Sequence, residues 1–269
     1  MPFADLALAR RIEGAWARSS VETAEAHEGR LPGVGVAIMP VAGGVAVFHG
    51  ARSTLSQAQG LGLNGAVNDA DLEQLEAFYQ VRGVPAQVEV CTLADPSLWA
   101  LLGKRGYRPS EPSHVLIRPI AAGEAWGQPP APLEVETVGT DDATAFAETV
   151  LGAFFESPAT PPDELRAAVL TTFAVSSATC WLARVAGAPA GGATAFVVEG
   201  VALFAGDGVL PAFRGRGIHD ALLRARLARV ASLGCDLAVT CTQPGSVSQR
   251  NAERVGFRVA YARLLFLRD

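Results

Sequence analysis

One segment of the sequence recurs, without a gap, at an offset of 150 residues (240 against 90). Residues 90–108, VCTLADPSLWALLGKRGYR, align with residues 240–258, TCTQPGSVSQRNAERVGFR. Each copy runs from an apolar segment through a polar loop into a helical pattern, and then ends in Gly, an aromatic residue and Arg. The shared order favours duplication of one folding unit. The chain is therefore expected to contain two halves of similar fold.

A stretch rich in proline and glycine separates these halves. Residues 119–133, PIAAGEAWGQPPAPL, hold four prolines and two glycines without a periodic pattern, which is typical of a linker. A chain of 269 residues suits two domains of roughly 130 residues each. We expect a first domain over 1–120, a linker over 121–132 and a second domain over 133–269.

Composition excludes several classes of protein. The apolar share of 49% predicts a globular protein with a substantial core. No apolar run approaches the roughly 20 residues of a membrane span, and the charged N-terminal segment is unlike a secretory signal. A net charge of −5 argues against a general nucleic-acid binder. The four cysteines are scattered, without metal-ligand spacing. We expect a cytoplasmic protein with reduced thiols that binds no metal, nucleic acid or membrane.

The second half alternates between strand and helix patterns. The strand patterns cover 133–138, a hairpin over 180–200, 201–205, 235–240 and 257–268. The helix patterns cover 141–154, 217–234 and 246–255. In the helix over 217–234, one apolar stripe is expected to face the sheet. It comprises Leu223, Leu227, Val230 and Ala231. This order predicts a mixed sheet with helices on its faces.

A loop rich in glycine and arginine precedes that helix. Gly206-Asp207-Gly208 interrupts the strand, which indicates a bulge or a close approach by a ligand. The segment RGRGIH, residues 214–219, follows and enters the helix. Its glycines let successive N–H groups point into one concavity, and the helix N-terminus and the arginines add positive charge. The combination fits a pyrophosphate, although neither a Walker loop nor a GxGxxG motif is present. The alternative is a tight strand–helix turn with solvated arginines.

The order of these motifs resembles the GNAT superfamily of acyl-CoA-dependent N-acyltransferases. The pattern V-x-P-x-x-R-G-x-G-I over 209–218 is followed by a helix, a strand, a second helix and Gly256-Phe257. The resemblance covers roughly 133–269. It implies an α/β (α+β) protein with two GNAT-like domains, each a mixed, mostly antiparallel sheet flanked by helices.

The resemblance also implies a coenzyme site. Backbone amides of the loop would hold the coenzyme A pyrophosphate, and splayed neighbouring strands would admit the pantetheine arm. The family expects Gly or Ala where His219 stands, and the larger side chain would crowd the phosphate. The coenzyme-binding residues that it implies are Val209, Arg214, Gly215, Arg216, Gly217, Ile218, His219 and Asn251.

The catalytic groups depart from the family pattern. Ala252 stands where many members have a tyrosine that acts as the general acid for the departing thiolate, and Ser246 stands where an asparagine is usual. Asp207 is the ionisable residue of the phosphate-loop strand and therefore the candidate base, with a plain bulge residue as the alternative. Direct transfer can proceed without a strong protein acid or base, because positioning two substrates can contribute more than proton transfer. Tyr261, Glu156 and His219 are further candidate catalytic groups without an assigned role. Cys241 is expected to be a packing residue and not an acyl-carrying nucleophile.

The matching loop of the first half has lost the features that suit an anion. At the same offset the segment is NGAVND, residues 64–69, which lacks both arginines. Val67 replaces Gly217, and Asp69 and Asp71 would repel a pyrophosphate. Tandem GNAT proteins with one inactive half are a known layout. The first half is therefore expected to keep the fold and to lack the coenzyme site.

These observations favour an acyltransferase, most simply one that moves acetyl from acetyl-CoA, or another acyl-CoA, to a primary amine of a small molecule. A non-catalytic acyl-CoA-binding sensor is the alternative that Ala252 favours. A scaffold that binds no coenzyme is the alternative that His219 favours. Both a monomer and a homodimer remain open.

Overall fold

The computed structural model describes residues 4–30, 33–121, 123–124, 126–127, 129–155, 161 and 163–268. These residues form two compact units. The C-terminal unit comprises Leu116–Cys241 and Gly245–Arg258. The N-terminal unit comprises the described residues up to Val115, together with Thr242–Pro244 and the residues from Val259 onward. Part of the predicted linker, at positions 122, 125 and 128, lies outside the described residues.

The C-terminal unit is built on a mixed sheet. Its strand order is β5-β10-β9-β8-β7-β6, in which the neighbours from β6 to β9 are antiparallel and β9 and β10 are parallel. The strands are β6 (Leu133–Val138), β7 (Ala178–Val185), β8 (Ala188–Val198), β9 (Val201–Val209), β10 (Leu237–Thr242) and the end of β5 (Arg108–Pro119). The predicted mixed, mostly antiparallel sheet is confirmed.

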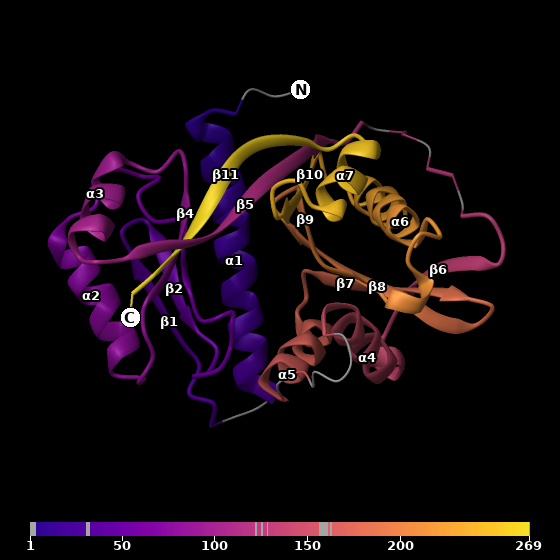
Figure 1. Cartoon of the computed structure of the whole chain (residues 1–269), viewed down its shortest axis with the longest axis horizontal. Helices are drawn as coiled ribbons and strands as arrows, with labels where there is room; N and C mark the ends of the chain where they lie inside the picture. Colours follow the sequence, from indigo (N-terminus) through magenta and orange to yellow (C-terminus); the bar gives the residue numbers. More distant parts are fainter. Residues whose placement is uncertain are drawn as a thin grey trace. The chain divides into compact units, whose positions relative to one another are not determined.

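Helices cover both faces of this sheet. Figure 1 shows α6 and α7 on one side of the strands and α4 and α5 on the other. The α-helices are α4 (Ala143–Phe154), α5 (Asp163–Thr171), α6 (Ile218–Ser232) and α7 (Val247–Arg254). Short 3-10 turns cover Thr140–Asp142, Thr172–Ala174 and Pro211–Phe213. Ser246 caps α7 by accepting a hydrogen bond from the Gln249 N–H, as the helix pattern over 246–255 predicts.

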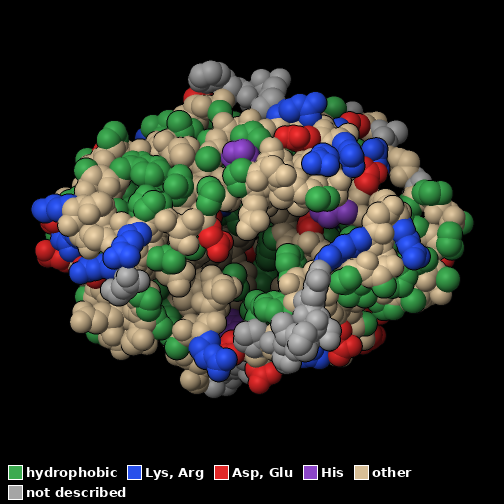
Figure 2. Space-filling view, in the orientation of Figure 1, with side chains coloured by type: hydrophobic (Ala, Val, Ile, Leu, Met, Phe, Trp, Pro, Cys, Tyr) green, Lys and Arg blue, Asp and Glu red, His purple; other side chains and the backbone are tan. Residues whose placement is uncertain are grey.

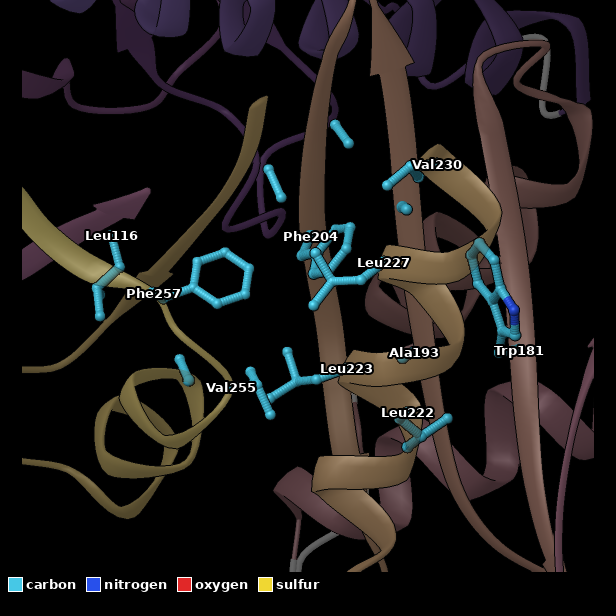
Figure 3. Close-up of a cluster of buried hydrophobic side chains, with 14 of the residues drawn as sticks. Leu116, Trp181, Ala193, Phe204, Leu222, Leu223, Leu227, Val230, Val255 and Phe257 are labelled. Atoms are coloured by element: carbon cyan, nitrogen blue, oxygen red, sulfur yellow. The ribbon is translucent and has the colours of Figure 1, made fainter. Parts of the chain in front are cut away.

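The main core lies between α6 and the sheet. Side chains of α6 gather there with Phe204 and Phe257 (Figure 3). Leu223, Leu227 and Val230 are buried as the stripe predicts, but Ala231 is only partly buried. Leu222 and Arg226 lie on the buried face instead, because the period of 3.6 residues turns position 231 toward the edge of the contact. Burying each large apolar side chain contributes about 1.5–3 kcal/mol.

The N-terminal unit repeats the element order of the other unit, except that a single helix precedes its first hairpin where β6, α4 and α5 precede the other. Its strand order is β1-β2-β3-β4-β11-β5. The elements are α1 (Leu6–Arg30), β1 (Ala37–Val41), β2 (Gly44–Phe48), β3 (Ala58–Gln59), α2 (Asp69–Gln80), β4 (Gln87–Cys91), α3 (Pro96–Lys104), the first part of β5, and β11 (Arg258–Leu267). At the offset of the repeat, α2, β4, α3 and β5 correspond to α6, β10, α7 and β11. The duplicated segment therefore has the same local structure in both copies.

The last strand belongs to the N-terminal unit, although the sequence places it in a domain over 133–269. β11 pairs antiparallel with β4, with Arg263 opposite Cys91. Buried Glu13 of α1 accepts hydrogen bonds from Arg263 Nε at 2.8 Å and from the Tyr261 hydroxyl at 2.7 Å. Removing one partner of a buried ion pair typically costs about 3–5 kcal/mol. This pair anchors β11 to α1, while the backbone ladder joins β11 to β4.

We predict that a fragment of residues 134–269 will not form a soluble monomer. It lacks β4, the partner of β11, and the end of β5, the neighbour of β10. Unpaired strand edges of this kind lead to aggregation. Size-exclusion chromatography of the fragment tests this, and co-expression with residues 1–133 should restore solubility. A soluble fragment with a cooperative unfolding transition would contradict the prediction.

Two buried histidines make the N-terminal unit sensitive to acid. The rings of His27 and His49 lie edge to face, with their centroids 6.0 Å apart. Burial, and to a smaller extent the nearby His27, lowers the pKa of His49 to about 4. Between this value and the ordinary 6.5, the unfolded chain binds a proton that the native chain does not. Stability is therefore complete above pH 6.5 and decreases as the pH falls toward 4.

We predict that His49→Leu removes much of this acid sensitivity. For wild type, the pKa difference corresponds to a loss of about 2 kcal/mol at pH 5 relative to pH 7.5. Denaturant unfolding of the N-terminal unit at the two pH values measures this loss. His114→Leu, at a half-buried histidine of the same unit, is the matched control and should keep the wild-type difference. Equal pH dependence in His49→Leu and wild type would refute the assignment.

Candidate functional site

A β-bulge in β9 shapes one wall of the site. Gly192 of β8 lies opposite Gly208, but two positions along β8 Thr194 lies opposite Ala205. Gly206 and Asp207 of β9 therefore face a single residue of β8, and Gly206 has a φ of 64°. A Cβ on Gly208 would lie 2.6 Å from the Ala153 Cβ, so α4 packs directly on the bulged strand. The predicted interruption at 206–208 is thus a bulge.

The strands β9 and β10 part beside the bulge. Their parallel pairing runs from Val201 opposite Leu237 to Phe204 opposite Thr240 and ends there in the described residues. A cleft of about 610 Å³ opens at this place. Its walls are Ala153 and Phe154 of α4, residues 207–209 of β9, Phe213, Arg214, Gly215, Gly217, the first turn of α6, and Val247, Ser248, Asn251 and Arg254 of α7.

The N-terminus of α6 presents free amides to this cleft. Gly217 is the N-cap residue, with a φ of 74° and no side-chain cap. The first backbone bond of the helix runs from the Ala221 N–H to the Gly217 carbonyl, so the N–H groups of residues 218–220 have no acceptor within the helix. Gly215 also has a positive φ, 76°, and a Cβ there would meet open space. Such an arrangement binds anions through aligned amides and the helix dipole.

The two loop arginines face different cavities. Arg214 lines the cleft and donates to the carbonyls of Val209 at 3.3 Å and Ala153 at 3.0 Å. Arg216 instead lines a neighbouring cavity of about 540 Å³, with its guanidinium 5.4 Å from the centre of the Phe213 ring. Figure 2 shows Lys and Arg side chains gathered over the region of α6 and α7. The cleft thus combines a local cation with the amide-lined helix end.

Arg226, which sequence reasoning missed, pairs with Asp207. This arginine is 0% exposed, and it donates to both carboxylate oxygens of Asp207. It also donates to the Thr194 carbonyl at 3.1 Å, and its guanidinium lies 4.3 Å from the centre of the Phe204 ring. The available signal was its position three and four residues after Leu223 and Leu222 on the buried stripe. The carboxylate of the candidate base is therefore occupied by a guanidinium.

His219 lies next to this pair. Its Nε2 is 3.7 Å from Asp207 Oδ2, and its side chain is 16% exposed. Burial lowers the pKa of His219, and the nearby Asp207 carboxylate partly opposes this effect. Neither ring nitrogen has a hydrogen-bond partner in the part of the chain that the structure describes. The imidazole thus lies at the edge of the cleft, beside the Asp207 carboxylate.

The remaining candidates have other surroundings. Ala252 is buried in the main core, and Tyr261 belongs to the N-terminal unit, where it bonds Glu13. Asn251 lines the cleft and accepts a hydrogen bond from Arg254 Nη1 at 3.2 Å. Cys241 is partly buried and is not part of a disulfide. Glu156 lies outside the described residues.

The corresponding helix end of the N-terminal unit is closed by its own side chains. The Asn68 side chain accepts from the Asp71 N–H at 3.1 Å, and Asp71 accepts in return from the Asn68 N–H at 2.9 Å. The Val67 N–H donates to Ser97 Oγ at 2.8 Å. Asp69 is paired with Arg105 at 2.8 Å. No equivalent set of free amides is available there among the described residues.

The described ranges contain no group of three or more His, Cys, Asp or Glu that could hold a metal ion. None of the helices described has both the length and the apolar character that a membrane crossing requires.

Comparison with known proteins identifies the domain that contains the cleft. Residues 144–257 match the model of the acetyltransferase (GNAT) family. A GCN5-related N-acetyltransferase from Kribbella flavida shares 17% identity, with a TM-score of 0.64 over 91% of this chain and 95% of that chain. A tandem GNAT protein from the clavulanic acid biosynthesis pathway shares 18% identity, with a TM-score of 0.57 over 74% and 68%.

A GCN5-related N-acetyltransferase from Sphaerobacter thermophilus has the same fold, with 22% identity and a TM-score of 0.57 over 73% of this chain and 66% of that chain. At these identities the likeness shows the fold. The search of curated proteins gives no match. The parted strands, the bulge and the open helix end all lie within the segment that the family model matches. Residues 144–257 therefore form a domain of the GNAT family of acetyltransferases, the family that the loop motif predicts.

Proposed function

We propose that the protein is an acyl-CoA-dependent N-acyltransferase that moves acetyl from acetyl-CoA to a primary amine of a small molecule. One observation carries the proposal. The uncapped N-terminus of α6 opens into a cleft at the place where β9 and β10 part. An anion site at one end of a strand gap suits a substrate that has a pyrophosphate followed by a narrow arm.

The coenzyme contacts follow from this arrangement. The amides of Gly215, Gly217, Ile218 and His219 would hold the pyrophosphate, with Arg214 as the adjacent cation. The backbone of Val209, on the bulged strand, would bind the pantetheine arm. The carboxamide of Asn251 would add a polar contact from α7. Arg216 would act through charge from the neighbouring cavity.

Positioning supplies a large part of the chemistry in this proposal. The cleft would hold the thioester carbon beside the amine, and such orientation can contribute about 7–11 kcal/mol to lowering a barrier. The amine must also lose a proton before it attacks. Asp207, the candidate base in the sequence analysis, is bound to Arg226. Its carboxylate would therefore orient neighbouring groups.

A non-catalytic acyl-CoA sensor is the second candidate. Ala252, where many members of the family have a tyrosine, is buried among apolar side chains and offers no acid. The sensor would use the same coenzyme contacts without turnover. We place either protein in the cytoplasm, where the thiols of Cys91, Cys180, Cys235 and Cys241 would stay reduced.

We predict that each chain binds one acetyl-CoA, because the helix end of the N-terminal unit is closed by Asn68 and Asp71. Isothermal titration calorimetry with acetyl-CoA measures the stoichiometry. Thiol release from acetyl-CoA with polyamine, aromatic amine and amino-sugar probes then separates the enzyme from the sensor. Binding without thiol release would favour the sensor. Two equivalent binding sites per chain would contradict the prediction that the N-terminal unit binds no acetyl-CoA. A chain that binds no acetyl-CoA would refute both the enzyme and the sensor.

We predict that Gly217→Val weakens coenzyme binding more than Arg216→Glu does. Valine is strained at a φ of 74° and would distort the amides that follow it. The choice of valine copies the first half, where Val67 stands at the corresponding position. Arg216→Glu leaves the amides intact and changes only a charge outside the cleft. We therefore expect a partial loss of coenzyme affinity, and added salt should make this loss smaller. Arg229→Glu, an exposed change at the far end of α6, is the charge control. Equal affinities in all three variants would show that the loop does not bind the coenzyme.

A further inference from the structure

The cavity beside the coenzyme cleft has no ligand in the proposed function. Its volume of about 540 Å³ lies within the roughly 300–1,000 Å³ that small-molecule sites occupy. Gly217, Ile218 and Asp220 line both this cavity and the cleft. The two spaces therefore meet at the first turn of α6, which is where the pyrophosphate is proposed to bind.

The pyrophosphate of coenzyme A joins the pantetheine arm to a ribose that carries adenine and a 3′-phosphate. The arm is proposed to enter the cleft along Val209, so the ribose must leave the helix end in another direction. We propose that the adjoining cavity binds this nucleotide end, with Arg216 and Arg224 as the residues that hold the 3′-phosphate. The inference rests on the proposed coenzyme binding and adds a subsite to it.

Two arginines supply positive charge to this cavity. Arg216 lines it, and among the described residues its recorded contact is with the Phe213 ring, whose centre lies 5.4 Å from the guanidinium. Arg224 also lines the cavity, and its side chain is 41% exposed. A phosphate monoester carries a charge of about −1.5 to −2 at neutral pH, and a guanidinium can bind two of its oxygens at once. A pair of arginines is therefore suited to such a group.

Asp220 is the acidic residue among the cavity walls. Its carboxylate accepts hydrogen bonds from Arg224 Nε at 2.7 Å and from Arg224 Nη2 at 3.5 Å. Two arginines and one aspartate leave a net positive charge in the cavity. The contact with Asp220 also fixes the direction of the Arg224 side chain, so less conformational entropy is lost when a phosphate binds.

The remaining walls of the cavity are largely apolar. They come from the proline-rich segment, from the end of β7 and from α6. The residues concerned are Pro129, Pro130, Pro132, Leu133, Val185 and Ala221. Small-molecule sites commonly combine such apolar walls with a few charged groups that fix the orientation of the ligand. The apolar part of this cavity suits the adenine ring, and the arginines suit the phosphate.

The proline-rich segment is held in place as a wall. Arg118 Nε donates to the Val255 carbonyl at 2.7 Å, and Arg118 Nη1 donates to Glu124 at 2.9 Å. The same guanidinium lies 4.4 Å from the centre of the Trp126 ring, which packs against the main core. The segment that the sequence predicts as a linker is thus fastened to the C-terminal unit at several points. It can shape a binding site as well as join two halves.

The α7 side of the cleft is the competing direction for the nucleotide. Asn251 and Arg254 line the cleft there, and Arg254 already donates to Asn251 at 3.2 Å. A nucleotide placed on α7 would meet one arginine and would share the cleft with the pantetheine arm. The cavity beyond the helix end offers two arginines and a separate space, so we favour it.

The test compares the affinities of coenzyme A and 3′-dephospho-coenzyme A, which differ only in the 3′-phosphate. Calorimetry gives both affinities for the full-length wild type, Arg216→Gln, Arg224→Gln and the double variant. Arg229→Gln, on the same helix but not lining this cavity, is the charge control. Arg254→Gln tests the α7 direction. Thermal unfolding of each variant shows whether the fold is kept.

We expect wild type to bind coenzyme A about 10–100-fold more tightly than the dephospho form, the usual effect of hydrogen bonds to a charged group. Each single variant should reduce this ratio, and the double variant should bring it to about one. Arg229→Gln and Arg254→Gln should keep the wild-type ratio. Because the ratio compares two ligands on one protein, a change of charge near the pyrophosphate largely cancels.

Two results would overturn the subsite. Equal binding of the two ligands by wild type would show that the protein does not hold the 3′-phosphate. A preference that persists in the double variant would place the 3′-phosphate elsewhere, and its loss in Arg254→Gln would place it on α7. Failure of wild type to bind either ligand is a separate result, which refutes the proposed function itself.

Discussion

The ion pair between Arg226 and Asp207 is the interaction on which the C-terminal unit depends. Arg226 lies inside the apolar interface of α6, where a lone guanidinium would be strongly destabilising. Its charge is met by Asp207, and Asp207 stands in the bulge of β9. The same bulge lies where β9 leaves β10. Core packing, strand geometry and the opening of the cleft therefore share one buried contact.

The two halves show that a helix N-terminus can be satisfied in two ways. In α2 a capping box closes the first turn, and a serine hydroxyl takes the N–H of the preceding residue. In α6 a glycine at the N-cap leaves the first turn open. The fold is kept in both cases, because each helix is held on its sheet by its apolar face and not by its N-cap. A few loop residues thus separate a structural half from a half with a binding site.

Local features of the fold followed from the sequence, and long-range pairings did not. Strand and helix patterns and the bulge at 206–208 are properties of neighbouring residues. The pairing of β11 with β4 was missed, because the choice of a strand partner depends on residues far away, such as Glu13. Arg226 was missed because an arginine on an apolar stripe has no sequence signal for its partner. The direction of Arg216 depends on the Phe213 ring, which no motif specifies.

The bond between Glu13 and Arg263 also sets an order for folding during synthesis. The two residues are 250 positions apart, so β11 leaves the ribosome long after α1. At about 5–20 residues per second, roughly 10–50 s pass between the synthesis of Glu13 and that of Arg263. During that time α1 carries a carboxylate that remains hydrated, and β4 has an open edge. The N-terminal unit is therefore completed only after the C-terminal unit has been synthesised, and the open edge of β4 is exposed in the meantime to chaperones and to strand exchange between neighbouring copies.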